Sequence, residues 1–272
     1  MNIPFHDFGG NGPLLHFAHA NAYPPRCFQQ LIHQLLPHYH VIGIYHRPLW
    51  PGSQPKDLTS WEMIGDDMLR FFAEQGVEQL VGVGHSMGAV ATMFAAVKRP
   101  SLFTKLILIE PVVLPPVFIA EVQDDPEQLD QLPIISHAHQ RRFQWPNRQA
   151  AFNHFRRRKA FHRWPDEALR DYVNYGLRDA AGQVTLTYTR EWEAHCYRLA
   201  AYPAWQLIPQ ITPPLLVIRA SNTDSLWPES WQLWQEIQPQ TTFIQIEDAG
   251  HMVVMEQPTL IANLTLNFLH DH

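Results

Sequence analysis

The sequence of 272 residues is poor in cysteine and has no long uninterrupted apolar segment. Its two cysteines, Cys27 and Cys196, lie far apart without metal-ligand spacing, so we expect isolated thiols and no disulfide framework. No run approaches the length of a membrane-spanning helix, and residues 1–12 lack the basic and apolar pattern of a secretory signal. These absences predict a cytoplasmic protein without a membrane partner.

Charge is also scarce, since charged residues make up 17% of the chain and the formal net charge is −6. This acidic balance gives no reason to expect a nucleic-acid partner, and we interpret the basic run at 156–159 as a solvated or salt-bridged surface. The alternating histidines at 38 and 40 and at 137 and 139 have no neighbouring carboxylate or cysteine in metal spacing. We therefore expect no metal and no cofactor.

Hydrophobic residues, at 46%, are sufficient for one large domain with a substantial core. Short apolar or β-branched runs predict strands, and apolar residues at three- and four-residue spacing predict helices between them. The predicted strands are 14–18, 39–45, 80–83, 105–109, 215–219 and 242–246, with 3–8 as a short antiparallel edge strand. The predicted helices are 27–36, 61–75, 89–97, 229–237 and 258–269. This alternation predicts an α/β fold with a mostly parallel sheet between two helical layers.

Residues 111–202 interrupt this alternation. They contain almost no strand-like run and include helical patterns at 147–159 and 165–176. We therefore predict a catalytic body formed by residues 1–110 and 203–272, with a helical cap inserted at 111–202.

The pentapeptide Gly84-His85-Ser86-Met87-Gly88 joins a predicted strand to a predicted helix. Glycines two residues before and after the serine leave room for a sharp turn that presents the hydroxyl at the end of a strand, known as a nucleophile elbow. The alternative is a glycine-rich loop without catalytic function. The strand-to-helix context favours Ser86 as a catalytic nucleophile, with Gly84 and Gly88 forming the elbow.

A serine nucleophile needs a general base and an acid that orients the base. His251 follows the last predicted strand and is the best placed of 16 histidines. Asp224 follows the strand at 215–219, so we predict Asp224 as the acid. Glu110, at the end of the strand before the insertion, and Asp248 remain rivals.

The negative charge that develops on an attacked carbonyl oxygen requires two N–H donors. The backbone N–H of Met87 directly follows the nucleophile and is our first candidate. The backbone N–H of Asn21, in the loop after the strand at 14–18, is the second. We expect these two groups to form the oxyanion hole.

The elbow motif, Asp224 and Gly250-His251 resemble the nucleophile, acid and histidine motifs of the α/β-hydrolase superfamily over nearly the whole chain. His19-Ala20 departs from that pattern, since many relatives have His-Gly there. The inserted segment is similar to the caps of a lipase/esterase-like group. The resemblance implies an α/β-hydrolase fold with a cap.

Aromatic residues of the cap can line an apolar acyl or alcohol pocket, although most of them can equally pack the cap onto the body. They are Phe143, Trp145, Phe152, Phe155, Phe161, Trp164, Trp192 and Tyr197. Glu191 and Glu193 can hold an arginine of the cap, discriminate against anionic substrates or lie on a solvated helix face.

We therefore predict a serine carboxylesterase that cleaves small to medium apolar esters through an acyl-enzyme. The same residues could instead cleave a C–C bond, a thioester or a lactone. A hydrolase fold that binds a small molecule without turnover is the alternative from another class.

Overall fold

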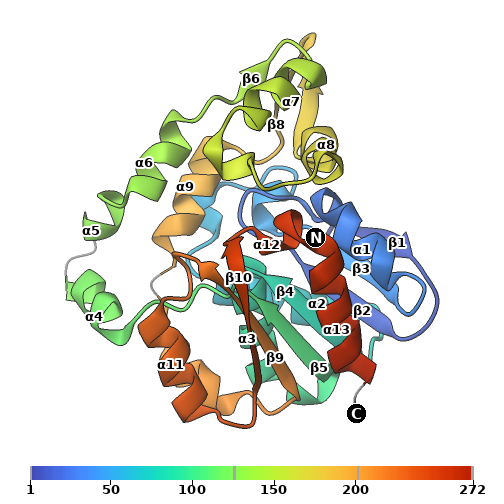
Figure 1. Ribbon diagram of the computed structural model, residues 1–272, viewed down its shortest axis with the longest axis vertical. Coiled ribbons are helices and arrows are strands. Elements are labelled where there is room, and N and C mark those ends of the chain that lie inside the picture. Colours follow the sequence, from blue (N-terminus) through green and yellow to red (C-terminus); the bar gives the residue numbers. More distant parts are fainter. Residues whose placement is uncertain (1, 125–126, 201, 271–272) are drawn as a thin grey trace.

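The computed structural model describes residues 2–124, 127–200 and 202–270. Within these residues, seven strands form one sheet in the order β1-β3-β2-β4-β5-β9-β10 (Figure 1). Strand β1 pairs antiparallel with β3, and the other pairs are parallel. The strands are β1 (Phe5–Gly9), β2 (Leu14–Ala18), β3 (His40–Ile44), β4 (Leu80–His85), β5 (Phe103–Ile109), β9 (Leu215–Asn222) and β10 (Thr242–Gly250). The predicted mostly parallel sheet and its antiparallel edge strand are confirmed.

Helices cover both faces of this sheet, as the alternation of the sequence predicted. Side chains of β5 show the reason: Leu106 and Leu108 belong to one core cluster, and Ile107 and Ile109 to the other. One cluster includes α1 (Gln29–Leu35), α12 (Val253–Glu256) and α13 (Pro258–His270). The other includes α2 (Glu62–Glu74), α3 (Met87–Lys98), α10 (Ala204–Leu207) and α11 (Pro228–Ile237). Because both faces are buried, the central strands consist mainly of apolar residues.

The segment between β5 and α10 forms a separate layer at one end of the sheet (Figure 1). Its helices are α4 (Pro116–Asp124), α5 (Glu127–Asp130), α6 (Pro133–Gln140), α7 (Arg148–Arg156), α8 (Asp166–Tyr175) and α9 (Arg190–Arg198). We refer to this inserted segment as the cap. Across the described residues, no helix of the cap or the body is long and apolar enough to span a membrane.

The cap also contains a small antiparallel sheet that the sequence analysis did not predict. Its strands, in the order β6-β8-β7, are β6 (Gln144–Trp145), β7 (Leu177–Ala180) and β8 (Gln183–Leu186). The hairpin between β7 and β8 turns at Ala181 and Gly182, with φ of 47° and 77°. Two consecutive positive φ values are typical of a two-residue hairpin turn, and Gly182 was the sequence signal for it. The strands were missed because they have only two to four residues.

Five aromatic residues in the described part of the cap pack against one another: Trp145, Phe155, Phe161, Trp164 and Tyr172. The ring of Tyr172, fully buried, lies 5.1 Å from Phe155, 5.7 Å from Phe161 and 6.0 Å from Trp164, measured between centroids. Buried aromatic pairs of this kind stabilise a packing interface through both area and ring geometry. These side chains therefore join the cap to the core of the body on the α1 side.

Candidate active site

Ser86 lies at the sharp turn between β4 and α3, with φ 57° and ψ −123°. A serine rarely adopts positive φ, and such strain persists only where neighbouring structure fixes it. A Cβ on Gly84 would lie 2.6 Å from the Cα of Ala89, and one on Gly88 would lie 2.2 Å from the carbonyl oxygen of Ala18. Both glycines are thus required by close backbone contacts, and the turn has the geometry of a nucleophile elbow.

A chain of hydrogen bonds connects Ser86 to a buried carboxylate through His251. The Oγ of Ser86 lies 2.9 Å from Nε2 of His251, and Nδ1 of the same ring lies 3.0 Å from Oε2 of Glu110. A carboxylate that accepts a hydrogen bond from Nδ1 keeps the ring proton on that nitrogen and leaves Nε2 free to accept the serine proton. The structure therefore brings together a hydroxyl, an imidazole and a carboxylate in the arrangement of a catalytic triad.

Asp224 does not make the contact with His251 that the sequence analysis assigned to it. It is exposed in the loop after β9, and its carboxylate accepts a hydrogen bond of 3.4 Å from Oγ of Ser225. Glu110 has the position of the acid instead. Glu110 follows β5, one strand further from β10, and its additional methylene group lets the carboxylate reach the ring.

Glu110 is held in place by several neighbours. Its Oε1 accepts a hydrogen bond of 2.5 Å from the backbone N–H of Ala220, and its Oε2 accepts one from the hydroxyl of Thr223. The side chain is fully buried. The backbone φ of Glu110, at 49°, is another uncommon conformation. A buried carboxylate with these partners is fixed before any substrate arrives.

The surroundings of His251 adjust both its orientation and its basicity. Burial alone lowers the pKa of His251, but the hydrogen bond and the charge of Glu110, with smaller contributions from Asp224 and Glu256, raise the pKa above its ordinary value of 6.5. The Nε2 atom of His85, within the elbow motif, donates a hydrogen bond of 2.9 Å to the carbonyl oxygen of His251. The elbow therefore also fixes the backbone of the histidine loop.

The loop containing Asn21 borders Ser86 and is fixed by polar contacts. Nε2 of His19 accepts a hydrogen bond of 3.0 Å from the N–H of His46, so the ring proton is on Nδ1, which donates to the carbonyl oxygen of Ala20 at 2.9 Å. The side-chain amide of Asn21 donates to the carbonyl oxygen of Glu193 in the cap at 3.0 Å. Positive φ in this loop occurs at Ala22, at 68°, so Ala20 adopts no left-handed conformation.

Met87 supplies the other candidate donor of the oxyanion hole. It is the first residue of α3, so its backbone N–H has no acceptor within the helix. The positive end of the helix dipole lies at the same place and favours negative charge there. Met87 and Asn21 both line the cavity into which Ser86 opens.

A cavity of about 510 Å³ adjoins Ser86 and His251 at the junction of body and cap. Its wall is mainly apolar, with Phe118, Leu132 and Ile134 from the cap. Of the aromatic cap residues considered in the sequence analysis, Tyr197 lines this cavity. The other aromatic residues of the wall are Tyr23, Trp61, Phe118 and Trp227. Sequence patterns did not identify these four because loops and distant helices bring them together.

Glu193 forms an ion pair with an arginine of the cap, one of the three alternatives that the sequence left open. Its Oε2 accepts a hydrogen bond of 2.6 Å from Arg141, and the same guanidinium donates to the hydroxyl of Tyr172 at 2.8 Å. Arg156, in the basic run, pairs with Asp166 at 2.7 Å. These contacts account for both arginines as structural partners of the cap.

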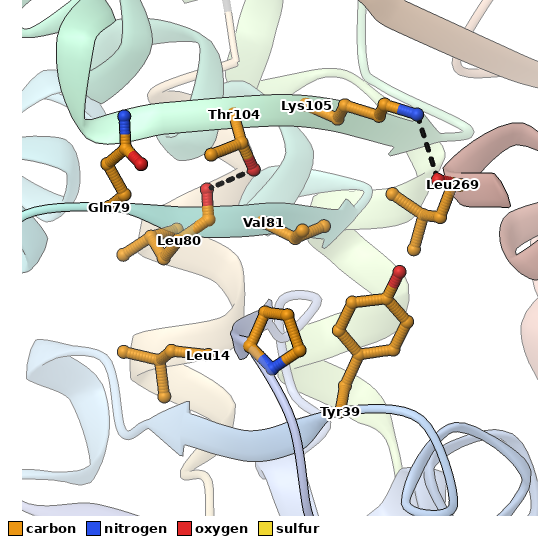
Figure 2. A pocket seen from close by; sticks show the side chains of 9 residues that line it. Leu14, Tyr39, Gln79, Leu80, Val81, Thr104, Lys105 and Leu269 are labelled. Carbon is orange, nitrogen blue, oxygen red and sulfur yellow. Dashed lines mark hydrogen bonds between the residues drawn. The ribbon is translucent and has the colours of Figure 1, made fainter. Parts of the chain in front are cut away.

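A second cavity, of about 350 Å³, lies at the opposite end of the sheet (Figure 2). Its lining includes Leu14, Leu80 and Lys105, near the starts of β2, β4 and β5, whereas Ser86 follows the end of β4. The ammonium group of Lys105 donates to the carbonyl oxygen of Leu269 at 2.9 Å, which caps α13 (Figure 2). The described residues that line this cavity include no serine, histidine and carboxylate arranged as they are beside the first cavity.

The two cysteines are isolated thiols, as the sequence predicted. Cys27 and Cys196 are buried and unpaired, and burial raises the pKa of both thiols, that of Cys196 to about 12. Within the described part of the chain, no three His, Cys, Asp or Glu side chains gather as metal ligands.

Comparison with known proteins gives the family. The model of the alpha/beta hydrolase family matches residues 17–264. The chain therefore belongs to this family of hydrolases, and the predicted fold is confirmed.

Two curated proteins show what kinds of relatives the chain has. It is 29% identical over 177 residues to the type I acyl-CoA thioesterase mpaH of Penicillium roqueforti, a match that covers 60% of this chain and 39% of the thioesterase. The chain thus spans well under half of that protein. It is 22% identical to the 2-(acetamidomethylene)succinate hydrolase of Mesorhizobium japonicum, over 96% of this chain and 89% of the hydrolase.

A solved structure supports the same fold. The crystal structure of E-2-(acetamidomethylene)succinate hydrolase superposes with a TM-score of 0.83 at 19% identity, covering 98% of this chain and 94% of that one. At this identity the likeness concerns the fold alone.

Proposed function

We propose that this chain is a serine carboxylesterase that hydrolyses small to medium apolar esters through an acyl-enzyme. The observation that carries the proposal is the continuous hydrogen-bond chain from Ser86 through His251 to Glu110. A buried carboxylate, an imidazole and a hydroxyl in this order make a serine nucleophilic at neutral pH. The proposed acid is Glu110 in place of Asp224.

In the first half of the reaction, Oγ of Ser86 bonds to the ester carbonyl carbon and gives its proton to Nε2 of His251. The carbonyl π electrons move onto oxygen, where the backbone N–H groups of Met87 and Asn21 hold the negative charge. When the C=O bond forms again, the bond to the alcohol breaks and the alcohol takes the proton from His251. The acyl group then remains on Ser86.

In the second half, His251 removes a proton from water as the water oxygen bonds to the acyl carbon. The bond to Oγ of Ser86 breaks, and His251 returns the proton to the serine. Glu110 stays ionised in both halves and stabilises the imidazolium form of His251. The cavity of about 510 Å³ is of a size that holds a small-molecule substrate.

Thioester hydrolysis is a second candidate because the acyl-CoA thioesterase of Penicillium roqueforti is among the relatives. The same acyl-enzyme forms, and a thiolate leaves with less need for protonation than an alkoxide. Amide-bond cleavage would demand more from His251, because an amine must be protonated as it leaves.

The test is to label the purified protein with a fluorophosphonate, locate the modified peptide by mass spectrometry, and assay p-nitrophenyl esters from acetate to decanoate. We expect labelling at Ser86 and turnover that Ser86→Ala abolishes. Acyl-CoA hydrolysis is measured in parallel, and a rate higher than that of ester hydrolysis would favour the second candidate. Full ester turnover by Ser86→Ala would contradict the proposal. It would also be contradicted if the unaltered protein binds an ester but shows neither labelling nor turnover.

A further inference from the structure

Asp224 is an acidic group of the cavity wall without a cationic partner. Across the described residues no lysine, arginine or histidine forms an ion pair with it, and its carboxylate accepts the 3.4 Å hydrogen bond from Ser225. Two other carboxylates near the site have close partners, since Glu110 binds His251 and Glu193 binds Arg141. Asp224 therefore retains a charge that the protein does not neutralise locally.

The rest of the wall favours a cation over an anion. Among the described residues that line the cavity there is no lysine or arginine. Five lining residues are aromatic: Tyr23, Trp61, Phe118, Tyr197 and Trp227. Aromatic faces attract an ammonium group electrostatically, most strongly where water is excluded.

Asp224 and part of this aromatic wall are directly connected. The indole N–H of Trp227 donates to the backbone carbonyl oxygen of Asp224 at 2.8 Å. The ring of Phe118, from α4 of the cap, lies 5.8 Å from that of Trp227 with an angle of 51° between the planes. Asp224, Trp227 and Phe118 therefore lie at one part of the cavity wall, to which both the body and the cap contribute.

We infer that the cavity beside Ser86 accepts a substrate whose ammonium group binds between Asp224 and the aromatic wall. This inference rests on the proposed function and specifies its substrate class: esters or thioesters with a quaternary or protonated amine on the acyl or alcohol part. The uncompensated charge of Asp224 also repels a carboxylate on the substrate. The ester carbonyl lies at Ser86, and the ammonium group lies at the wall formed by Phe118, Asp224 and Trp227.

The charge of Asp224 is already felt by its neighbours in the cavity. Burial is the main cause that raises the pKa of Tyr197, and the negative charges of Glu193 and Asp224 raise it further. The same field from Asp224 helps to raise the pKa of His251. Both shifts have the sign that a site of negative potential produces.

The test compares substrates of equal shape and different charge. Butyrylthiocholine and 3,3-dimethylbutyl thiobutyrate differ at one atom, a charged nitrogen against a neutral carbon, on the leaving-group part. A second pair, p-nitrophenyl 4-(trimethylammonio)butanoate and p-nitrophenyl 5,5-dimethylhexanoate, places the charge on the acyl part. We expect one charged ester to have a kcat/KM about 10 to 100 times that of its neutral partner.

Asp224→Asn should reduce this ratio to within about threefold of one, because the amide keeps the shape and removes the charge. The matched control is Glu229→Gln, which removes a negative charge from an exposed position in the first turn of α11 that does not line the cavity. The control should retain the ratio of the unaltered protein. Equal kcat/KM values for both members of both pairs, or an unchanged ratio in Asp224→Asn, would overturn the inference.

Binding to Ser86→Ala separates this inference from the proposed reaction. Butyrylcholine should quench the tryptophan fluorescence of Ser86→Ala with a Kd about ten times lower than that of 3,3-dimethylbutyl butyrate, and Asp224→Asn in the same background should remove the difference. Preferential binding without ester turnover would reject the esterase and keep the ammonium site. Fluorophosphonate labelling at Ser86 without any preference for the ammonium compound would keep the esterase and reject the ammonium site.

Discussion

Two carboxylates follow neighbouring strands of the sheet, and their surroundings differ. Glu110, after β5, is fully buried and accepts hydrogen bonds from Ala220, Thr223 and His251. Asp224, after β9, is exposed to the cavity and lacks a close cationic partner among the described residues. The first environment fixes a charge beside the imidazole of His251, and the second leaves a charge on the cavity wall without a close cationic partner.

The comparison shows that position at the carboxyl end of a strand does not define the role of an acid. Both Glu110 and Asp224 lie between Ser86 and His251 in the chain, so both keep the serine, acid, histidine order. Burial and hydrogen-bond partners decide which one can hold the imidazole. The four predictions that follow separate the two carboxylates by experiment.

The largest effect is expected for Ser86→Ala, which removes the nucleophile itself. We predict a fall in kcat of about 10⁵-fold or more on p-nitrophenyl butyrate, because the remaining groups have no atom to acylate. The thermal midpoint should change little, since the alanine keeps the elbow backbone. This variant sets the background rate against which either carboxylate is measured, and a fall of less than tenfold would remove Ser86 from the reaction.

Glu110→Gln is expected to lower kcat by about 10³- to 10⁴-fold, because an amide cannot stabilise the imidazolium form of His251 or fix its tautomer. Asp224→Asn should lower kcat on the same neutral ester by at most about tenfold. Steady-state kinetics of the two variants, measured side by side, makes the comparison. If Asp224→Asn is the more damaging change, the assignment of the acid is wrong.

The pH dependence should also separate the two acids. His251 must be neutral to accept a proton, and its pKa lies above the ordinary 6.5, so kcat/KM should rise with pH and reach half its maximum above pH 6.5. Removing negative charge lowers this pKa. Glu110→Gln should therefore shift the rising limb to lower pH by more than Asp224→Asn does, because Glu110 is the larger cause. Equal shifts in the residual activities would contradict this order.

The smallest effect is expected for Thr223→Val, which removes the hydroxyl that donates to Glu110. The change keeps the shape of the side chain and costs two hydrogen bonds, the one to the buried carboxylate and the one that the hydroxyl accepts from the backbone N–H of Ser225 at 3.1 Å. We predict a loss of about 1.5 to 3 kcal/mol in the free energy of unfolding and a severalfold fall in kcat. Urea unfolding and the ester assay measure the two quantities, and a variant of unchanged stability and rate would show that this bond does not hold Glu110.

Much of the fold was predictable because its signals are local. Apolar runs and helical spacing indicated the strands and helices of the body, and the loss of that alternation indicated an inserted segment. The small sheet of the cap was missed because β6 has two residues and β7 and β8 have four each. Tertiary packing, more than local propensity, forms strands of this length.

The elbow at Ser86 and the placement of His251 could be predicted from motif and position in the chain. The acid could not, because two strand ends offer a carboxylate and the sequence does not show which one is buried. The cavity wall was also out of reach, since Tyr23, Trp61 and Trp227 come from three distant loops or helix ends. A long-range arrangement of this kind leaves no periodic signal in the chain.

Whether Glu110 orients His251 is tested most directly by observing the proton on Nδ1 of His251. This proton is observed by NMR in protein with ¹⁵N-labelled histidine and assigned with His251→Ala. A carboxylate that accepts this proton moves its resonance far downfield. We predict that the downfield signal is present in the unaltered protein, persists in Asp224→Asn and is lost or moved upfield in Glu110→Gln. A signal that survives in Glu110→Gln and disappears in Asp224→Asn would show that Asp224 holds the histidine.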